Sequence, residues 1–265
     1  MADKAIGGDL SVFSINSASQ LTFVGEASIA ITHIDVDGSV ITGEYESAQI
    51  VGSEASIKCS LMSILTGTTK VNNLDVSAFT VGGTDYLGSL ESGSLKIEIP
   101  HEEAKAVGTR WAYPIASGKK TIQMDSDLMV PSSSGAGLAL LMDGATTDLE
   151  VDASITINSI SVTFGALLTF LEHIIAKGKA QRQKIVLKGR VTPPTAPSGT
   201  STILEKFLNT RAAIGFVLTT KASGGATYSG NMLPKSLTMT WANNALVMVE
   251  TEFASQGSVD ISATA

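Results

Sequence analysis

"SLTMTWANNALVMVETEFAS", which spans residues 236–255, is the stretch that decides the fold class of this chain. Apolar and polar residues alternate on both sides of Asn243–Asn244, and such alternation is typical of half-buried β-strands. Asparagine also tolerates the positive φ that a two-residue hairpin turn requires. The stretch therefore predicts a β-hairpin in which Trp241 lies opposite Leu246 and Met239 lies opposite Met248.

A looser version of the same device occurs earlier, as "SLKIEI" at 94–99 followed by "KTIQMDSDLMV" at 120–130. "SLKIEI" and "SLTMTW" are 142 residues apart, and "THI" at 32 and "EHI" at 172 are 140 apart. The similar offsets predict a divergent duplication, and a period this long indicates a doubled domain, not a solenoid. We therefore expect one β domain at 1–130, a linker at 131–148 and a second, similar β domain at 149–265. If the likeness is coincidental, the second part is an appended domain of another kind.

Composition supports a mainly β chain. Apolar residues make up 43% of the sequence, which is enough for a substantial core, while only 16% are charged and 5% are aromatic. Serine, threonine and glycine are abundant, and this mixture favours strands and turns over long surface helices. The predicted fold class is mainly β with short helices, arranged as two β-sandwich or half-barrel domains.

Each predicted domain contains at least one short amphipathic helix. In the first, Ile57, Leu61, Ile64 and Leu65 have helical spacing within 56–67. In the second, "GALLTFLEHIIAKG" at 165–178 carries an apolar stripe, and "TILEKFLNTR" at 202–211 begins with a capping box between Thr202 and Glu205. We expect helices at all three places.

Several classes of protein are disfavoured. No run approaches the ~20 apolar residues of a membrane helix, and "MADKAIGGDL" does not resemble a secretory signal, so we expect assembly in a cytoplasm. A single cysteine excludes an internal disulfide and fits a reducing compartment. The net charge of −7 argues against tight binding to nucleic acid, which depends on lysine and arginine.

No catalytic motif is evident. His33, His101 and His173 are far apart in sequence, and Cys59 falls within an apolar pattern, so we expect no enzyme and no cofactor. "HIDVDGSVITGE" at 33–44 partly matches a calcium-binding loop, but histidine at its first ligand position is a poor oxygen donor. A hairpin turn at Asp37–Gly38 explains the same letters more simply.

Charge is distributed unevenly along the chain. Residues 1–145 contain 8 basic and 17 acidic residues, whereas 146–265 contain 10 basic and 8 acidic ones. When the two parts are aligned near His33 and His173, an acidic set falls where the second part has a basic set. These sets are Asp35, Asp37, Glu44 and Glu46, and Lys177, Lys179, Arg182 and Lys184. Either they are two solvated loops, or neighbouring copies or halves dock through them.

The doubled strand-rich pattern, the acidic composition rich in small residues, the hairpin ending "VETEFAS" and the absence of a catalytic motif together resemble the major tail protein of long-tailed bacteriophages. The resemblance extends over most of the chain and rests on pattern and composition. It implies a structural protein of the virion tail whose copies form stacked rings around a channel for DNA.

The resemblance also implies partners: other copies of the chain, and the tape measure, terminator and distal tail proteins. Viral DNA would pass through without specific binding. Three copies would form a pseudo-sixfold ring if the chain is duplicated, whereas six copies, each with an appended decoration domain, would form a ring if it is not. An acidic channel wall would keep phosphate from adhering. The alternatives are a β-sandwich surface-binding or capsid decoration module, and, less favoured, an enzyme that uses Cys59 or a histidine.

Overall fold

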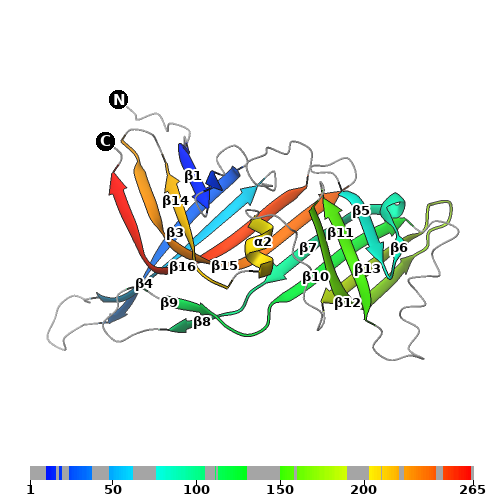
Figure 1. Cartoon of the computed structure of the whole chain (residues 1–265), viewed down its shortest axis with the longest axis horizontal. Helices are drawn as coiled ribbons and strands as arrows, with labels where there is room; N and C mark the ends of the chain where they lie inside the picture. Colours follow the sequence, from blue (N-terminus) through cyan, green and yellow to red (C-terminus); the bar gives the residue numbers. More distant parts are fainter. Residues whose placement is uncertain are drawn as a thin grey trace.

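The computed structural model describes residues 10–15, 18–19, 24–37, 48–61, 76–104, 111, 113–129, 150–157, 160–189, 203–209, 211–220, 224–242 and 247–263. They form a 14-stranded antiparallel sheet and a separate two-stranded sheet (Figure 1). The strands are β1 (Val12–Ile15), β2 (Ala18–Ser19), β3 (Val24–Asp37), β4 (Ala48–Leu61), β5 (Val76–Val81), β6 (Thr84–Asp85), β7 (Leu90–Glu98), β8 (His101–Ala104), β9 (Tyr113–Ala116), β10 (Thr121–Met129), β11 (Val151–Ile157), β12 (Ile160–Ile174), β13 (Arg182–Gly189), β14 (Ile214–Thr219), β15 (Ala226–Ala242) and β16 (Met248–Ala263). The helices are η1 (Leu87–Ser89) and α2 (Ile203–Asn209). The prediction of a mainly β chain with short helices is confirmed.

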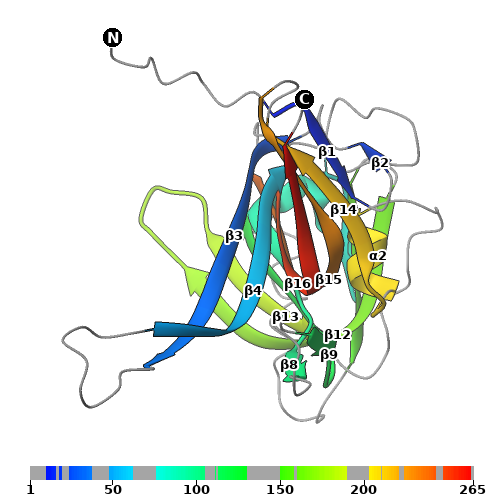
Figure 2. The same cartoon turned by 90° about the vertical axis from the view of Figure 1, so that its left-hand side faces the viewer.

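Eight strands form a continuous array, which we call the long sheet. Their order is β3, β4, β16, β15, β7, β10, β13 and β12, and every neighbouring pair is antiparallel. Figure 2 shows β3, β4, β16 and β15 side by side at one end of this array. In this order, pairs of strands from before the predicted linker alternate with pairs from after it. The linker itself lies outside the described residues. The division into domains at 1–130 and 149–265 stays a prediction.

The core lies on one side of the long sheet. The flanking strands β1 and β14 extend from β15, and β5 and β11 extend from β12. Together with α2 they enclose a single cluster of buried apolar side chains. Among its largest fully buried members are Phe13, Phe79, Phe164, Phe207 and Phe253. The rings of Phe207 and Phe253 lie 5.3 Å apart, which fixes α2 against β16.

The strands of the opening hairpin are confirmed, but its predicted register is wrong by one residue. Met239 lies opposite Val249, not Met248, and β15 ends at Ala242 while β16 begins at Met248. Val249 and Met239 are both 1% exposed, whereas Met248 is only partly buried. A slip of one residue would move the apolar set of one strand to the polar side, so burial sets the register. The earlier hairpin is also confirmed, as the β7–β10 pair.

Two of the three predicted helices are wrong where the structure describes them. Residues 56–61 belong to β4, with Ala55, Ile57 and Cys59 buried at a spacing of two, and 62–67 lie outside the described residues. Residues 165–174 belong to β12. The third helix is confirmed as α2, although the predicted capping box involves Thr202, which is outside the described part.

The predicted turn at Asp37–Gly38 is also wrong. Asp37 is still within β3 and lies opposite Ala48, so residues 38–47 make the connection between β3 and β4. A two-residue turn would have placed Val36 opposite Ser39. The tight turn of this type is instead at Gly82–Gly83, where both residues have positive φ and join β5 to β6.

Candidate functional site

The side of the long sheet that faces away from the core is mainly polar, and we call it the open face. Burial alternates along β7: Leu95 and Ile97 are buried, whereas Lys96 and Glu98 are exposed. Alternate side chains of a strand point to opposite sides. The register extends this pattern across β15, where Leu237 lies opposite Ile97 and Ser236 lies opposite Glu98. Here the face is a wall of polar side chains, many of them small. Toward β12 the same face also carries the exposed apolar side chains of Met129, Phe170 and Ile174.

The open face carries more acidic than basic residues. Opposite positions in the ladder place eight acidic and five basic residues of the described chain on it. The acidic residues are Glu26, Glu54, Glu98, Asp125, Asp127, Glu172, Glu250 and Glu252, and the basic residues are Lys58, Lys96, Arg182, Lys184 and Lys188. The excess comes from β3, β4, β15 and β16, where four carboxylates accompany Lys58 and also Lys235, which lies at an irregularity of β15 and has no directly opposite residue. The charges of the other four strands balance.

A hollow of about 350 Å³ lies in the acidic part of the open face. Glu26, Lys58, Thr238 and Glu250 line it, from four adjacent strands. A second hollow of about 290 Å³ lies beside it, under the β8–β9 hairpin, and His101 and Glu103 contribute to its wall. Both hollows are open, and polar or charged residues make up most of their lining, unlike the hydrophobic and aromatic residues that line most pockets for small-molecule ligands.

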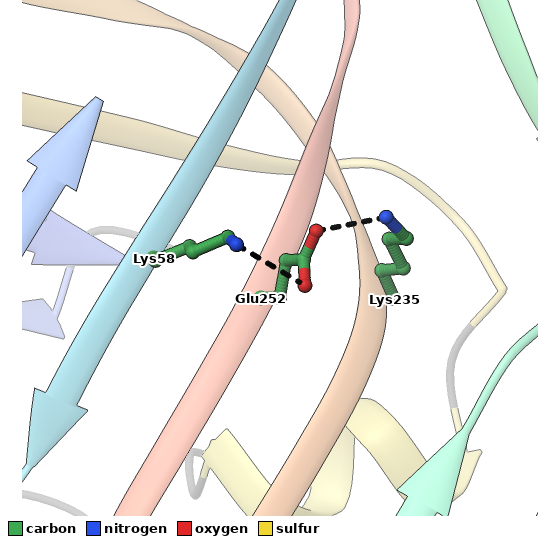
Figure 3. Close-up of polar contacts among 3 residues, drawn as sticks. All are labelled: Lys58, Lys235 and Glu252. Carbon is green, nitrogen blue, oxygen red and sulfur yellow. Dashed lines mark hydrogen bonds and ion pairs between the residues drawn. The ribbon is translucent and has the colours of Figure 1, made fainter. Parts of the chain in front are cut away.

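Three side chains join the neighbouring strands β4, β16 and β15 on this side of the sheet (Figure 3). The carboxylate of Glu252 lies between two ammonium groups, 2.8 Å from Nζ of Lys235 and 3.9 Å from Nζ of Lys58. Both lysine side chains are more than half exposed. Each such pair is worth less than about 1 kcal/mol, so the group organises surface charge more than it stabilises the fold.

The candidate reactive residues do not form a catalytic group. Cys59 is buried, its sulfur lies 2.7 Å from the hydroxyl of Thr251, and burial raises its pKa to about 11. Among the described residues, no contact joins Cys59 to a histidine or one histidine to another. A thiol in these surroundings stays protonated and is a poor nucleophile.

Each histidine contacts its own surroundings. Nδ1 of His33 lies 2.8 Å from the hydroxyl of Ser53 on β4, and His173 contacts Gln183 on β13. Burial lowers the pKa of His101. No cluster of histidine, cysteine, aspartate and glutamate within the described chain is arranged to hold a metal ion. Residues 33–37 also lie in a strand, where a calcium-binding loop would require the end of a helix and the start of its loop.

The predicted docking residues lie in two separate hairpins. Lys177, Lys179, Arg182 and Lys184 are all exposed and gather at the tip of the β12–β13 hairpin. Asp35 and Asp37 lie near the end of β3, whereas Glu44 and Glu46 are outside the described residues. Figure 1 places the two hairpins at opposite ends of the molecule. Asp35 and Asp37 therefore do not meet the basic set within one chain.

The β12–β13 hairpin is also unusually apolar for an exposed segment. Phe170 and Ile174 are exposed on β12, and Ile175 beyond its end is 70% exposed. Arg182, at the start of β13, forms an ion pair with Glu91 at 2.9 Å. Sequence reasoning identified the basic residues here, but it assigned Ile174 and Ile175 to a buried helical stripe and did not single out Phe170.

The open face itself was also missed. The sequence does contain the polar residues that form this face, for example Ser236, Thr238 and Thr240, which alternate with apolar residues. That they join with polar residues of other strands into one surface follows only from the strand order. Within the described residues, no helix is long and apolar enough to cross a membrane. No protein-family model, curated protein or solved structure matches this chain, so its function has to be inferred from its own residues.

Proposed function

We propose that this chain is a structural protein of a phage tail, and that its copies assemble into stacked rings that form a tube through which DNA passes. The observation that carries the proposal is the long sheet with its open face. Eight antiparallel strands present one continuous surface that is polar from β3 to β7 and also carries exposed apolar side chains toward β12. The described residues of this surface contain no catalytic group, and a broad surface of this kind suits the wall of a conduit.

The two ends of the long sheet support closure into a ring. Apart from its pairing with β4, β3 has no ladder partner in the described chain, and β12 lacks one beyond Ala166 on the side away from β13. Strand edges with unpaired N–H and C=O groups are templates for pairing with another chain. Because all seven pairings between them are antiparallel, β3 and β12 run in opposite directions. Pairing β12 of one copy with β3 of the next would continue the same alternation around a closed circle.

The charge of the open face supports the passage of DNA. With eight carboxylates and six cations in the described part, Lys235 included, this surface would repel the phosphate backbone slightly more than it attracts it. The side chains of β15 on this face, such as Ser236 and Thr238, are small. We propose that the open face lines the channel, and that viral DNA, tail proteins such as the tape measure, terminator and distal tail proteins, and further copies of this chain are its partners.

Negative-stain electron microscopy of the purified protein tests this function. We expect rings with a central hole, or tubes, with three chains in a ring if the chain is duplicated and six if it is not. A small oligomer without a hole at every protein concentration would contradict the proposal and favour a surface-binding or capsid decoration module. If rings form, a wall dominated by lysine and arginine would contradict the assignment of the open face to the channel.

A further inference from the structure

We infer that the chain is an internal dimer, in which two units of the same strand order exchange strands about a pseudo-twofold axis that passes between Lys96 and Thr238. The first unit consists of β1 to β10 without β8 and β9, and the second of β11 to β16 with α2. Each unit contributes an early hairpin, β3–β4 or β12–β13, and a late hairpin, β7–β10 or β15–β16. This inference concerns the single chain and does not depend on the proposed function.

The order of the long sheet reads the same from both ends. From one end it runs through the early hairpin of the first unit, β3 and β4, into the late hairpin of the second unit, β16 and β15. From the other end it runs through the early hairpin of the second unit, β12 and β13, into the late hairpin of the first unit, β10 and β7. Each early hairpin is therefore completed by the late hairpin of the other unit.

The register places the axis. One row of directly opposite residues crosses all eight strands from β3 to β12: Glu26, Ser60, Glu250, Thr238, Lys96, Gln123, Lys188 and Leu167. At its centre, a shift of 142 residues takes Lys96 to Thr238. On either side of this centre lie the pairs Leu95–Met239 and Ile97–Leu237. A shift of 142 forward takes Leu95 to Leu237, and the same shift backward takes Met239 to Ile97, so the two pairs are exchanged. A twofold axis between two antiparallel strands exchanges pairs in this way.

The flanking strands repeat with the same spacing. The letters "INS" occur at 15–17 and again at 157–159, which is also a shift of 142. Ile15 lies opposite Ala18 in the β1–β2 pair, and Ile157 lies opposite Ile160 in the β11–β12 pair, so both partners shift by 142 as well. On their other sides, β1 pairs with β14 of the second unit, and β11 pairs with β5 of the first. The exchange therefore includes the strands that cover the core.

The two units also differ in places. The β8–β9 hairpin lies between β7 and β10, whereas only residues 243–247 separate β15 from β16. Gln256 of β16 donates a hydrogen bond to the carbonyl of Pro114 on β9, at 3.1 Å, so this hairpin packs against one end of the sheet. The flanking strands differ as well, because β14 also pairs with β15 of its own unit, whereas β5 pairs with β6 and not with β7. The pseudosymmetry thus applies to the long sheet and to the β1–β14 and β5–β11 pairs, and not to every strand or loop.

Two consequences follow for the chain. Neither unit has a complete sheet of its own, so parts 1–130 and 149–265 would not behave as independent domains. The axis also makes the two units run in opposite directions within the sheet. A ring of three chains would therefore have units that alternate in direction, in place of a pseudo-sixfold arrangement.

Cleavage of the connection tests the exchange. A protease site inserted within residues 131–148 of the full chain allows the folded protein to be cut into its two parts without changing any described residue. We expect the parts to stay together during gel filtration and to unfold in one transition. Separation of the parts without denaturant would overturn the inference.

Disulfide cross-linking of the cut protein tests the axis. Cysteines at Lys96 and Thr238 should join the two parts on oxidation, because directly opposite residues have the Cα separation that a disulfide needs. The axis relates the pair Ser60–Glu250 to the pair Gln123–Lys188, so cysteines at either pair should also join the parts. Ser92→Cys with Thr238→Cys is the matched control, since it lies on the same strands and the same face but about 13 Å out of register.

The expected result is cross-linking at the three opposite pairs and little at the control. Equal cross-linking at the control and at Lys96–Thr238, or no cross-linking at one of the two related pairs, would contradict the pseudo-twofold arrangement. The cut protein without added cysteines gives an independent answer if a cysteine variant does not fold. All these measurements use single chains, so failure to form rings would leave them unaffected.

Discussion

Cys59 illustrates how one side chain narrows the range of functions. It lies on the buried side of β4, and its only described side-chain partner is the hydroxyl of Thr251. Burial raises the pKa of the thiol more than that hydrogen bond lowers it, to about 11. The sequence placed Cys59 in an apolar pattern correctly, but the partner on β16, 192 residues away, depends on strand order and could not be predicted.

We expect the Cys59 thiol to resist aromatic disulfide reagents in the folded protein at pH 8. A pKa about two units above the ordinary value leaves about 100-fold less thiolate, and burial limits access further. The measurement is the rate of thiol release in buffer and in denaturant, with the denatured chain as its control. Rapid reaction of the folded protein would revive Cys59 as a candidate nucleophile.

At the scale of elements, the close contact between β7 and β15 depends on Gly93. It lies opposite Trp241, and a Cβ atom at Gly93 would come within 2.5 Å of the carbonyl oxygen of Asp125 and 2.7 Å of the Trp241 ring. The buried indole thus occupies the space that a side chain at Gly93 would need. This contact lies at the junction of the strands that the proposed axis relates.

Gly93→Ala should therefore lower the free energy of unfolding, by about 1–3 kcal/mol, because either the backbone of β10 or the Trp241 ring must move. Chemical denaturation measures the change. Gly215→Ala is the matched control, since Gly215 is also in a strand and a Cβ atom added there would meet no neighbouring atom within 4 Å. We expect the control to change stability by less than about 0.5 kcal/mol. Equal effects at both positions would show that the close approach is not limiting.

The two wrong helix predictions have identifiable causes at this scale. Ile57 and Leu61 are four residues apart, a spacing that fits one face of a strand as well as one face of a helix. In β12 the ladder is irregular between Leu168 and Phe170, so that Leu168 and Leu171 lie on the same side despite a spacing of three. An irregularity of this kind imitates helical periodicity, and the sequence alone does not reveal it. α2 was predictable because its apolar stripe is short and isolated by polar residues.

At the scale of the whole molecule, strand identity was more predictable than strand order. The stretches at 94–99 and 236–241 could be recognised as alike, yet nothing in either indicates that they pair with each other. The open face and its charge follow from that order. The basic docking residues were predictable as a cluster because they are close in sequence, whereas half of the acidic set lies outside the described residues.

Reversal of the basic cluster tests its role in assembly. Changing Lys177, Lys179, Arg182 and Lys184 to glutamate should weaken the association of copies, most strongly at low salt, because charges are screened over about 10 Å at 0.1 M salt. Light scattering or sedimentation at several salt concentrations measures this. Unchanged association at low salt would mean that the residues are only solvated.

Arg182 also pairs with Glu91 within the chain, so a second comparison isolates contacts between copies. Lys177→Glu with Lys179→Glu makes the same kind of change without that ion pair. Lys119→Glu with Arg211→Glu is the matched control, because both residues are exposed and lie away from the hairpin. We expect the control to associate like the unaltered protein.

The β8–β9 hairpin has one more consequence. It accompanies only one of the two late hairpins, so the top and bottom of the strand framework, otherwise alike, become distinguishable. A column built from such chains would therefore have two structurally different ends. Addition of a subunit at one end would not be equivalent to addition at the other. A conduit that must begin at a fixed base and stop at a fixed length needs ends that differ in this way.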